Sequence, residues 1–256
     1  MTTVLITGAS GGIGLALARR YATDGCDLIL VSRSRERLAV AASELSRVHV
    51  DTIVADLATA EGPEVVAAAV QRTGVAVGIL VNNAGAGLQG PFVTTSLDRE
   101  LELVRLNVGA LLHLTKRLLP GMRARGRGHV VNIASVAAFL PGPYQSVYYA
   151  SKAFVLSFSE ALAEELRGTG IGVTAVCPGP TATGFHAAAG VRRARPFRPR
   201  SFMTAEAVAE ATVRGVRRNR RIVVPALTHR LLVLAIRLAP RRLVAWGSGV
   251  ASEPAT

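Results

Sequence analysis

Apolar residues along this chain gather in short runs rich in β-branched side chains, which alternate with longer stretches of helical periodicity. Runs that are apolar throughout are typical of parallel strands covered on both faces. We expect strands at Thr3–Thr7, Leu28–Ser32, Val48–Val54, Ile79–Asn82, His129–Ala134, Gly172–Cys177 and Ile222–Val224. We expect helices at Ile13–Thr23, Arg35–Ser46, Pro63–Thr73, Leu97–Leu119, Tyr144–Arg167 and Ala205–Arg217. The alternation predicts an α/β fold, a doubly wound (Rossmann-type) parallel sheet with helices on both faces, formed by residues 1–256 as a single domain.

Two stretches interrupt this alternation. Residues 178–203 contain four prolines and follow neither period, so we expect a loop over the substrate. Residues 226–246 are apolar with Arg230, Arg237 and Arg241 near one helical face, and Pro240 interrupts them. We favour packing of this basic amphipathic segment on protein beside the substrate site. The alternative is peripheral contact with an anionic membrane surface.

The composition excludes several classes of protein. Half of the residues are apolar and 18% are charged, which fits neither a disordered nor a fibrous chain. Two cysteines cannot form a disulfide framework and favour a reducing, cytoplasmic location. The first residues lack the features of a secretory signal, and the run Leu231–Ile236 is too short to cross a bilayer.

The net charge of +13 is concentrated in one segment. Residues 1–189 carry 16 basic and 14 acidic side chains, whereas residues 190–242 carry 14 arginines and only Glu206 and Glu210. A nucleic-acid-binding protein is one alternative, through residues 192–221. That cluster lacks interleaved aromatic residues and any recognisable reading motif, so we expect no nucleic-acid partner.

A glycine-rich turn follows the first expected strand and leads directly into a helix. Gly8, Gly12 and Gly14 lie in the sequence Thr-Gly-Ala-Ser-Gly-Gly-Ile-Gly. Glycines permit close approach of the backbone, and a helix N-terminus offers free N–H groups to a pyrophosphate. No Lys-Ser/Thr pair closes the motif as in a P-loop. The pattern therefore predicts a dinucleotide site.

The end of the second strand selects the dinucleotide. A carboxylate at this position would favour NAD, whereas Arg favours the 2′-phosphate of NADP. Ser32 and Arg33 occupy it, with Arg35 and Arg37 close behind. A hydroxyl followed by a guanidinium suits a phosphate, so we expect NADP(H).

Further motifs accompany the glycine turn. Asn-Asn-Ala-Gly follows the fourth strand at 82–85, Tyr148 and Lys152 form Tyr-x-x-x-Lys, and Ser135 lies 13 residues before Tyr148. By these motifs the chain resembles the short-chain dehydrogenase/reductase family from Thr3 to about Thr183. The resemblance implies catalytic roles for Asn107, Ser135, Tyr148 and Lys152. It also implies that Asp56 bonds the adenine amino group and that the Pro178-Gly179 segment contacts the nicotinamide amide. The expected cofactor-binding residues are Gly8, Ser10, Gly11, Gly12, Ile13, Gly14, Ser32, Arg33, Asp56, Leu57, Asn83, Ala84, Gly85, Tyr148, Lys152, Pro178, Gly179, Thr181 and Thr183.

The chemistry of these side chains suits reduction of a carbonyl. Tyr148 and Lys152 are four residues apart on an expected helix and so share a face. We expect the ammonium to lower the pKa of the phenol, which can then pass a proton to a carbonyl oxygen held by Ser135. By resemblance, Asn107 positions a water beside Lys152. We therefore expect an NADP-dependent oxidoreductase that interconverts a carbonyl and a secondary alcohol. A catalytically silent NADP-binding sensor is the alternative, and no His pair has the spacing of a metal site.

The substrate and the assembly are less determined. In this family the loops before the tyrosine and after the sixth strand line the pocket, and here they supply the mostly apolar set Val136, Ala137, Phe139, Leu140, Tyr144, Phe185, Phe197 and Phe202. We expect Ser135, Tyr144, Tyr148 and Phe185 to contact an apolar, fatty-acyl- or sterol-like substrate. The loop arginines favour an acidic or phosphopantetheine-bearing substrate as the alternative. We also expect a homodimer or homotetramer formed through Leu97–Leu119 and Tyr144–Arg167, with Leu111, Leu112, Leu118, Ala153, Leu156 and Ala161 in the contact.

Overall fold

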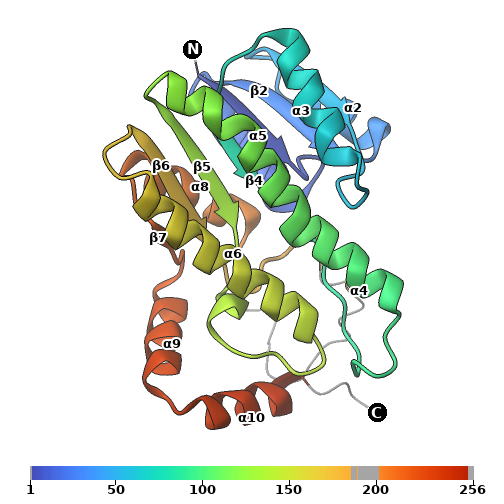
Figure 1. Ribbon diagram of the computed structural model, residues 1–256, viewed down its shortest axis with the longest axis vertical. Helices are drawn as coiled ribbons and strands as arrows, with labels where there is room; N and C mark the ends of the chain where they lie inside the picture. Colours follow the sequence, from blue (N-terminus) through green and yellow to red (C-terminus); the bar gives the residue numbers. More distant parts are fainter. Residues whose placement is uncertain (1, 186–188, 190–201, 253–256) are drawn as a thin grey trace.

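The computed structural model describes residues 2–185, 189 and 202–252, and within them it contains one seven-stranded parallel sheet (Figure 1). The strand order is β3-β2-β1-β4-β5-β6-β7. The strands are β1 (Thr3–Thr7), β2 (Asp27–Ser32), β3 (Val50–Val54), β4 (Val77–Asn82), β5 (Gly128–Ile133), β6 (Ile171–Val176) and β7 (Ile222–Val223). The seven strands expected from the sequence are confirmed, with boundaries shifted by one or two residues.

Helices cover both faces of this sheet. The helices, including two short turns of other type, are α1 (Gly12–Thr23), α2 (Arg35–Ser43), α3 (Gly62–Thr73), α4 (Leu97–Val104), π-helical η1 (Arg105–Gly109), α5 (Ala110–Ala124), 3₁₀ η2 (Val136–Phe139), α6 (Ser146–Glu165), α8 (Ala205–Arg217), α9 (Leu227–Leu238) and α10 (Arg241–Ser252). One core lies between the sheet and α1, α2 and α8, and the other between the sheet and α3, α5 and α6. The predicted doubly wound α/β fold is confirmed.

The strand order reverses at β1, which lies between β2 and β4. The chain leaves β1 toward one face and β4 toward the other, so the loops at their carboxyl ends diverge. A crevice at such a switch point is where doubly wound folds bind ligands. The glycine turn follows β1 and the Asn82–Gly85 turn follows β4, so both lie at this point.

Two expected helices differ from the prediction. Leu97–Leu119 is not one regular helix, because the π-helical turn Arg105–Gly109 separates α4 from α5. The helix expected from Tyr144 begins at Ser146, and Tyr144 has a left-handed backbone with φ of 64°. Its carbonyl accepts a hydrogen bond of 2.8 Å from Gly90 N. Tyr144 therefore belongs to the loop that precedes the helix.

We call α9 and α10 together the C-terminal arm, which runs beneath α6 and η2 (Figure 1). The helix breaks at Ala239–Pro240, as the proline predicts. The inner side of the arm packs on its own chain: Val233 is buried, and the Arg237 guanidinium lies 5.4 Å from the centre of the Phe139 ring. The Ser248 hydroxyl donates a 2.5 Å hydrogen bond to the Pro141 carbonyl. The favoured expectation of packing on protein therefore holds for the inner side.

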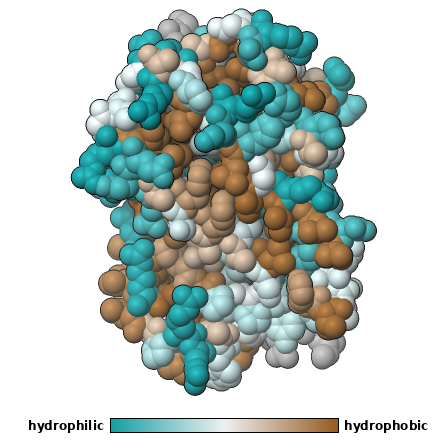
Figure 2. All heavy atoms as spheres, viewed as in Figure 1, coloured by the Kyte–Doolittle hydropathy of each residue, from teal (hydrophilic) through white to brown (hydrophobic). Residues whose placement is uncertain are grey.

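The outer side of the arm exposes large apolar side chains, which gather on the surface over α9 at the lower left of Figure 2. These residues are Leu227, Leu231, Leu232, Leu234, Leu238, Leu243, Trp246 and Val250. No acidic residue lies between Glu210 and Glu253. None of the helices in the described part of the chain is long and apolar enough to span a bilayer.

Candidate active site

The glycine turn is shaped for close approach of a ligand to the backbone. Gly8 has a φ of +65°, a conformation that side chains other than glycine rarely adopt. A Cβ added at Gly14 would lie 2.3 Å from the Gly8 carbonyl oxygen, so only glycine fits there. The α1 helix begins directly after Gly11, and no side chain caps its first N–H groups. Free N–H groups in a cradle without side chains fit a pyrophosphate.

The Asn82–Gly85 turn is hydrogen-bonded to the glycine turn. The backbone N–H groups of Asn83 and Ala84 each donate a 2.9 Å hydrogen bond to the Thr7 hydroxyl. The Asn83 side-chain amide donates to the carbonyls of Thr7 (2.8 Å) and Gly8 (3.3 Å). Two turns that are distant in sequence are thereby held as one rigid floor at the switch point.

The end of β2 lies beside the glycine turn. The hydroxyls of Ser10 and Ser32 are 2.9 Å apart, and Arg33 is exposed next to them. Arg37 is closer to the turn than the sequence indicated, because its guanidinium lies 3.3 Å from where a Cβ on Gly11 would be. Arg37 lies in the first turn of α2, which follows directly after Ser32 and Arg33, and this position is the signal that the sequence contains for it. Asp56, at the end of the next strand along the edge, is also exposed, and its carboxylate accepts from Ala58 N.

Ser135 and Tyr148 meet at the carboxyl end of β5. Ser135 follows that strand directly, and Tyr148 lies in the first turn of α6. The side chain of Ser135 hydrogen-bonds with that of Tyr148, which lowers the pKa of the phenol, and the Ser135 hydroxyl also lies 3.5 Å from the Pro178 carbonyl. The spacing of 13 residues is therefore bridged in space, and both hydroxyls are available to one substrate oxygen.

The pKa of Tyr148 differs from the expectation. We expected the Lys152 ammonium to lower this pKa, but burial of Tyr148 raises it to about 12 and outweighs the hydrogen bond from Ser135. The Lys152 ammonium lies 5.8 Å from the centre of the Tyr148 ring. In the protein without a bound partner, Tyr148 is therefore a protonated phenol at neutral pH, which is the form that donates a proton.

Lys152 is fully surrounded by protein. Its ammonium donates a 2.9 Å hydrogen bond to the Ile133 carbonyl, and burial lowers the pKa of Lys152 to about 8. A Cβ on Gly85 would lie 3.5 Å from this ammonium and 3.1 Å from Asn107 Oδ1. Gly85 is thus in close contact with both the lysine and the asparagine, where a larger residue would be crowded.

Asn107 lies in the π-helical turn, which explains its placement. Its Oδ1 accepts from Ala86 N (2.8 Å), and its Nδ2 donates to the Ala86 carbonyl and the Ser151 hydroxyl (3.0 Å each). The side-chain amide is thus engaged with the loop after β4 and with α6. A π-turn inserts an extra residue into a helix and often marks a functional position. The structure thus brings together all four predicted catalytic residues.

The segment after β6 contacts both the turn after Ser135 and the glycine turn. The Pro178 carbonyl accepts from Val136 N (3.0 Å), and the Thr181 hydroxyl donates to the Gly179 carbonyl (2.9 Å). A Cβ on Gly12 would lie 3.2 Å from the Thr183 methyl group, so this segment reaches the glycine turn. The expected residues Pro178, Gly179, Thr181 and Thr183 therefore lie beside the site.

The structure describes the surroundings of two of the expected substrate residues, Phe185 and Tyr144. The Phe185 ring lies 5.5 Å from the Tyr148 ring, centre to centre, and Tyr144 lies in the loop before α6. Phe197 and most of the loop 178–203 lie outside the described residues. Tyr149 packs edge-on against Tyr148 at 5.8 Å. A hydrogen bond joins its side chain to Ser252 of α10, so it is turned toward the C-terminal arm.

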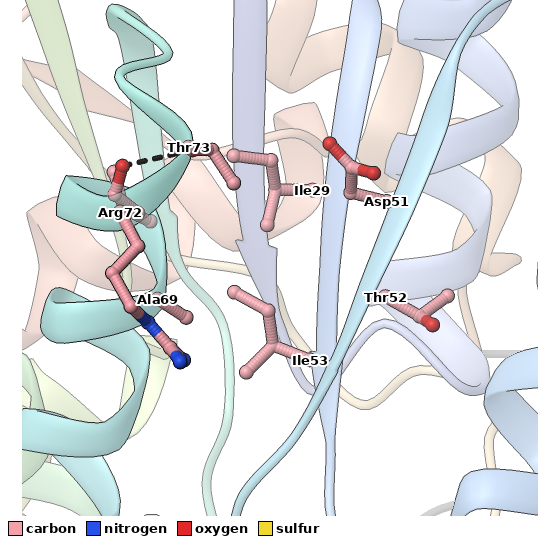
Figure 3. A pocket seen from close by; sticks show the side chains of 8 residues that line it. Ile29, Asp51, Thr52, Ile53, Ala69, Arg72 and Thr73 are labelled. Carbon is pink, nitrogen blue, oxygen red and sulfur yellow. Dashed lines mark hydrogen bonds between the residues drawn. The ribbon is translucent and has the colours of Figure 1, made fainter.

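A hollow of about 290 Å³ lies far from these residues, at the edge of the sheet (Figure 3). Ile29 and Ile53 form its floor between β3 and α3, with Asp51 and Arg72 on its rim. The Asp51 carboxylate pairs with the exposed His49 at 3.2 Å. Nothing in this hollow matches the chemistry assembled at Tyr148, so it is not the candidate site. Among the described residues, no group of three or more His, Cys, Asp or Glu side chains is arranged to hold a metal ion.

Comparison with known proteins agrees with this geometry. The family model "short chain dehydrogenase" matches residues 2–196. The ketoacyl reductase HetN of a Nostoc species is 37% identical over 180 residues, which are 69% of this chain and 62% of that protein. The chain therefore spans less than two thirds of this relative.

Solved structures match over nearly the whole chain. A short-chain dehydrogenase from Sphingobium yanoikuyae in complex with NADPH is 37% identical, with a TM-score of 0.83 and 92% of both chains covered. A bulky-bulky ketone specific alcohol dehydrogenase from Comamonas testosteroni is 34% identical, with a TM-score of 0.79, 92% of this chain and 91% of that chain covered. A Burkholderia phymatum short chain dehydrogenase/reductase in complex with NAD is 28% identical, with a TM-score of 0.82, 100% of this chain and 98% of that chain covered. On the family match and the shared fold, this chain belongs to the short-chain dehydrogenase family.

Proposed function

We propose that this protein is an NADP(H)-dependent oxidoreductase that interconverts a ketone and a secondary alcohol. The observation that carries the proposal is the joint placement of Ser135, Tyr148 and Lys152 at the switch point where the glycine turn lies. Each residue alone has an ordinary structural explanation, but their convergence beside a dinucleotide cradle does not.

Each residue has a distinct role in this proposal. The nicotinamide, when bound, supplies or accepts the hydride. The Ser135 and Tyr148 hydroxyls hold the substrate oxygen, and Tyr148 donates its proton to that oxygen during reduction. The Lys152 ammonium stabilises the phenolate that results. Asn107 holds the loop after β4 against α6, next to Gly85 and Lys152.

The substrate class follows from the lining. Phe185 and the η2 residues that follow Ser135 are apolar, which favours an apolar ketone of fatty-acyl or sterol-like character. The ketone specificity named for the Comamonas testosteroni relative supports this choice. A screen of NADPH oxidation against apolar, anionic and sugar-like ketones tests it. Turnover confined to anionic ketones would favour the acidic or phosphopantetheine-bearing alternative, and no turnover with measurable NADPH binding would favour the silent sensor.

The preference for NADP is a separate prediction. Changing Ser32 to Asp together with Arg33→Ala removes a phosphate-binding cation and adds a carboxylate for the ribose hydroxyls. One charge-assisted hydrogen bond is worth about 1.5–3 kcal/mol, so the NADP-to-NAD ratio of kcat/KM should fall roughly 10- to 100-fold. Equal binding of NAD and NADP by the unmodified protein would contradict the assignment. Arg37→Ala should lower NADP affinity as well, because its guanidinium lies beside Gly11.

We also propose that copies of the chain associate through α4, α5 and α6 into a homodimer or a homotetramer. Leu111 and Leu156, expected in this contact, are buried within their own chain because they pack against β6. The exposed apolar residues here are Leu97, Leu101, Val104, Leu112 and Phe154, and Figure 2 shows apolar surface over α4 at the right. We expect a dimeric or tetrameric mass at micromolar concentration by light scattering, and a monomer for Leu112→Arg combined with Phe154→Arg. A monomeric mass for the unmodified protein would reject the interface.

We propose a cytoplasmic protein whose arm touches an anionic membrane surface through its outer side. The exposed apolar residues there are accompanied by Arg241 and Arg242 at the start of α10, each contributing about 1 kcal/mol near anionic lipid at low salt. We expect flotation with anionic vesicles at low salt, and its loss in Leu234→Glu with Leu238→Glu. Val40→Glu, at an exposed position on α2, is the matched control. Absence of flotation at low salt would reject the contact.

A further inference from the structure

His229, in the first turn of α9, packs its imidazole directly on Gly179. A Cβ added at Gly179 would lie 2.0 Å from His229 Cε1, 2.4 Å from Nε2 and 2.5 Å from Nδ1. The ring thus occupies the space that a side chain at 179 would need. His229 Nδ1 is buried and has no hydrogen-bond partner in the described part of the chain. The contact with Gly179 is therefore made by van der Waals packing of the ring.

The identity of residue 179 is explained by this contact and not by its backbone. Gly179 is not among the glycines with a left-handed φ, so its conformation is open to other residues. The three atoms nearest to the Cβ of an alanine at position 179 would all belong to His229. The histidine and the glycine therefore form one fitted pair across two elements that are 50 residues apart in the chain.

Gly179 lies between two hydrogen-bonded parts of the site. On one side, the Pro178 carbonyl accepts from Val136 N (3.0 Å) and lies 3.5 Å from the Ser135 hydroxyl. On the other side, the Gly179 carbonyl accepts from the buried Thr181 hydroxyl (2.9 Å). A shift of Gly179 would therefore move both the partner of Ser135 and the segment that leads to Thr183.

The start of α9 is fixed independently of His229. Arg230 Nε donates a 2.7 Å hydrogen bond to the Val224 carbonyl, directly after β7. Further along, Arg237 stacks on Phe139 of η2, which follows Ser135. Because both ends of α9 are attached to the body of the protein, the helix can press His229 against Gly179.

We propose that His229 is a positioning residue that holds the segment Pro178–Thr183 in the conformation that receives the nicotinamide. The proposal rests on the proposed function, in which that segment contacts the cofactor. His229 itself touches neither the substrate oxygen nor the hydroxyl of Tyr148. It acts through Gly179, because its ring, which belongs to the C-terminal arm, packs against that residue.

A double-mutant cycle tests this pair. We expect Gly179→Ala to weaken NADPH binding, measured by fluorescence titration, and to lower kcat/KM by up to about 100-fold, because misplacement by about 1 Å has that cost. His229→Ala should weaken NADPH binding on the order of tenfold, since the segment loses its support. The double variant Gly179→Ala/His229→Ala should bind NADPH more tightly than Gly179→Ala alone, because the added methyl group enters the space the ring leaves.

Thermal unfolding without cofactor gives a second readout of the same cycle. Gly179→Ala should lower Tm, and His229→Ala in the same chain should recover part of that loss. Leu231→Ala, exposed on the same helix, is the control and should leave NADPH affinity unchanged. Additive effects of the two substitutions on both readouts would overturn the proposal. Failure of the unmodified protein to bind NADPH would instead overturn the proposed function, while the Tm cycle would still report on the contact.

Discussion

Replacing Tyr148 by Phe should lower the turnover of ketones by about 10²–10⁴-fold, because the variant keeps the ring but loses the proton donor. The ring of Tyr148 packs between Tyr149 and Phe185, and Phe preserves those contacts. We therefore expect the free energy of unfolding to change little. Single-turnover reduction under saturating NADPH measures the effect on the chemical step alone.

Tyr149→Phe is the matched control for this substitution. It removes the same hydroxyl from the neighbouring residue, whose side chain bonds to Ser252 of the arm and not to Ser135. We expect its turnover to stay within a few-fold of the unmodified protein. A Tyr148→Phe variant with near-full turnover would end the proposed mechanism, and a large loss in Tyr149→Phe alone would transfer the role to that residue.

Replacing Lys152 by Met should have the next largest effect. A unit charge about 6 Å from the centre of the phenol ring is worth about 2–3 kcal/mol at an effective dielectric constant of 20, which corresponds to roughly 100-fold in rate. Met nearly keeps the length of the side chain and removes the charge together with the hydrogen bond to the Ile133 carbonyl. Lys116→Met is the matched control, because Lys116 is the only other lysine in the chain and is exposed on α5.

The same lysine predicts a pH dependence. Burial lowers the pKa of Lys152 to about 8, so the ammonium is present below that pH and is lost as the pH rises through it. Tyr148, with its pKa raised to about 12, stays protonated over this range. We expect kcat/KM for ketone reduction to be level below about pH 7 and to fall above about pH 8. If Lys152→Met shows the same fall, another group is responsible.

The alternation of apolar runs was sufficient to predict the sheet, and the resemblance of the motifs to the family identified the proposed catalytic residues, which the sheet places at its carboxyl edge. Parallel strands place their following loops on one edge, so residues after β1, β4, β5 and β6 must converge there. For this reason Ser135 could be predicted from its position after the fifth strand, and Tyr148 with Lys152 from their spacing on one helical face.

Other features depended on contacts that periodicity does not encode. The π-turn at Arg105–Gly109 is defined by i→i+5 backbone hydrogen bonds, which a pattern of apolar residues does not show, so the turn at Asn107 could not be predicted. Leu111 and Leu156 looked like surplus apolar surface because the sequence does not show how much of each helix the sheet covers. The expected direction of the Tyr148 pKa was wrong because burial, which no sequence pattern measures, raises this pKa. His229 gave no signal beyond its presence in an amphipathic segment.

The C-terminal arm has a consequence for how the protein can change. All residues assigned to proton transfer and to the dinucleotide precede residue 184, whereas the arm that supports Gly179 and packs on Phe139 and Pro141 begins at residue 227. The family match ends at residue 196, before the arm. Under the proposed function, the reaction and the shape of its surroundings are therefore encoded in separate stretches of the gene. Recombination or directed evolution restricted to the last stretch therefore keeps the residues assigned to proton transfer and changes the support that Gly179, Phe139 and Pro141 receive, and with it the strength of cofactor binding.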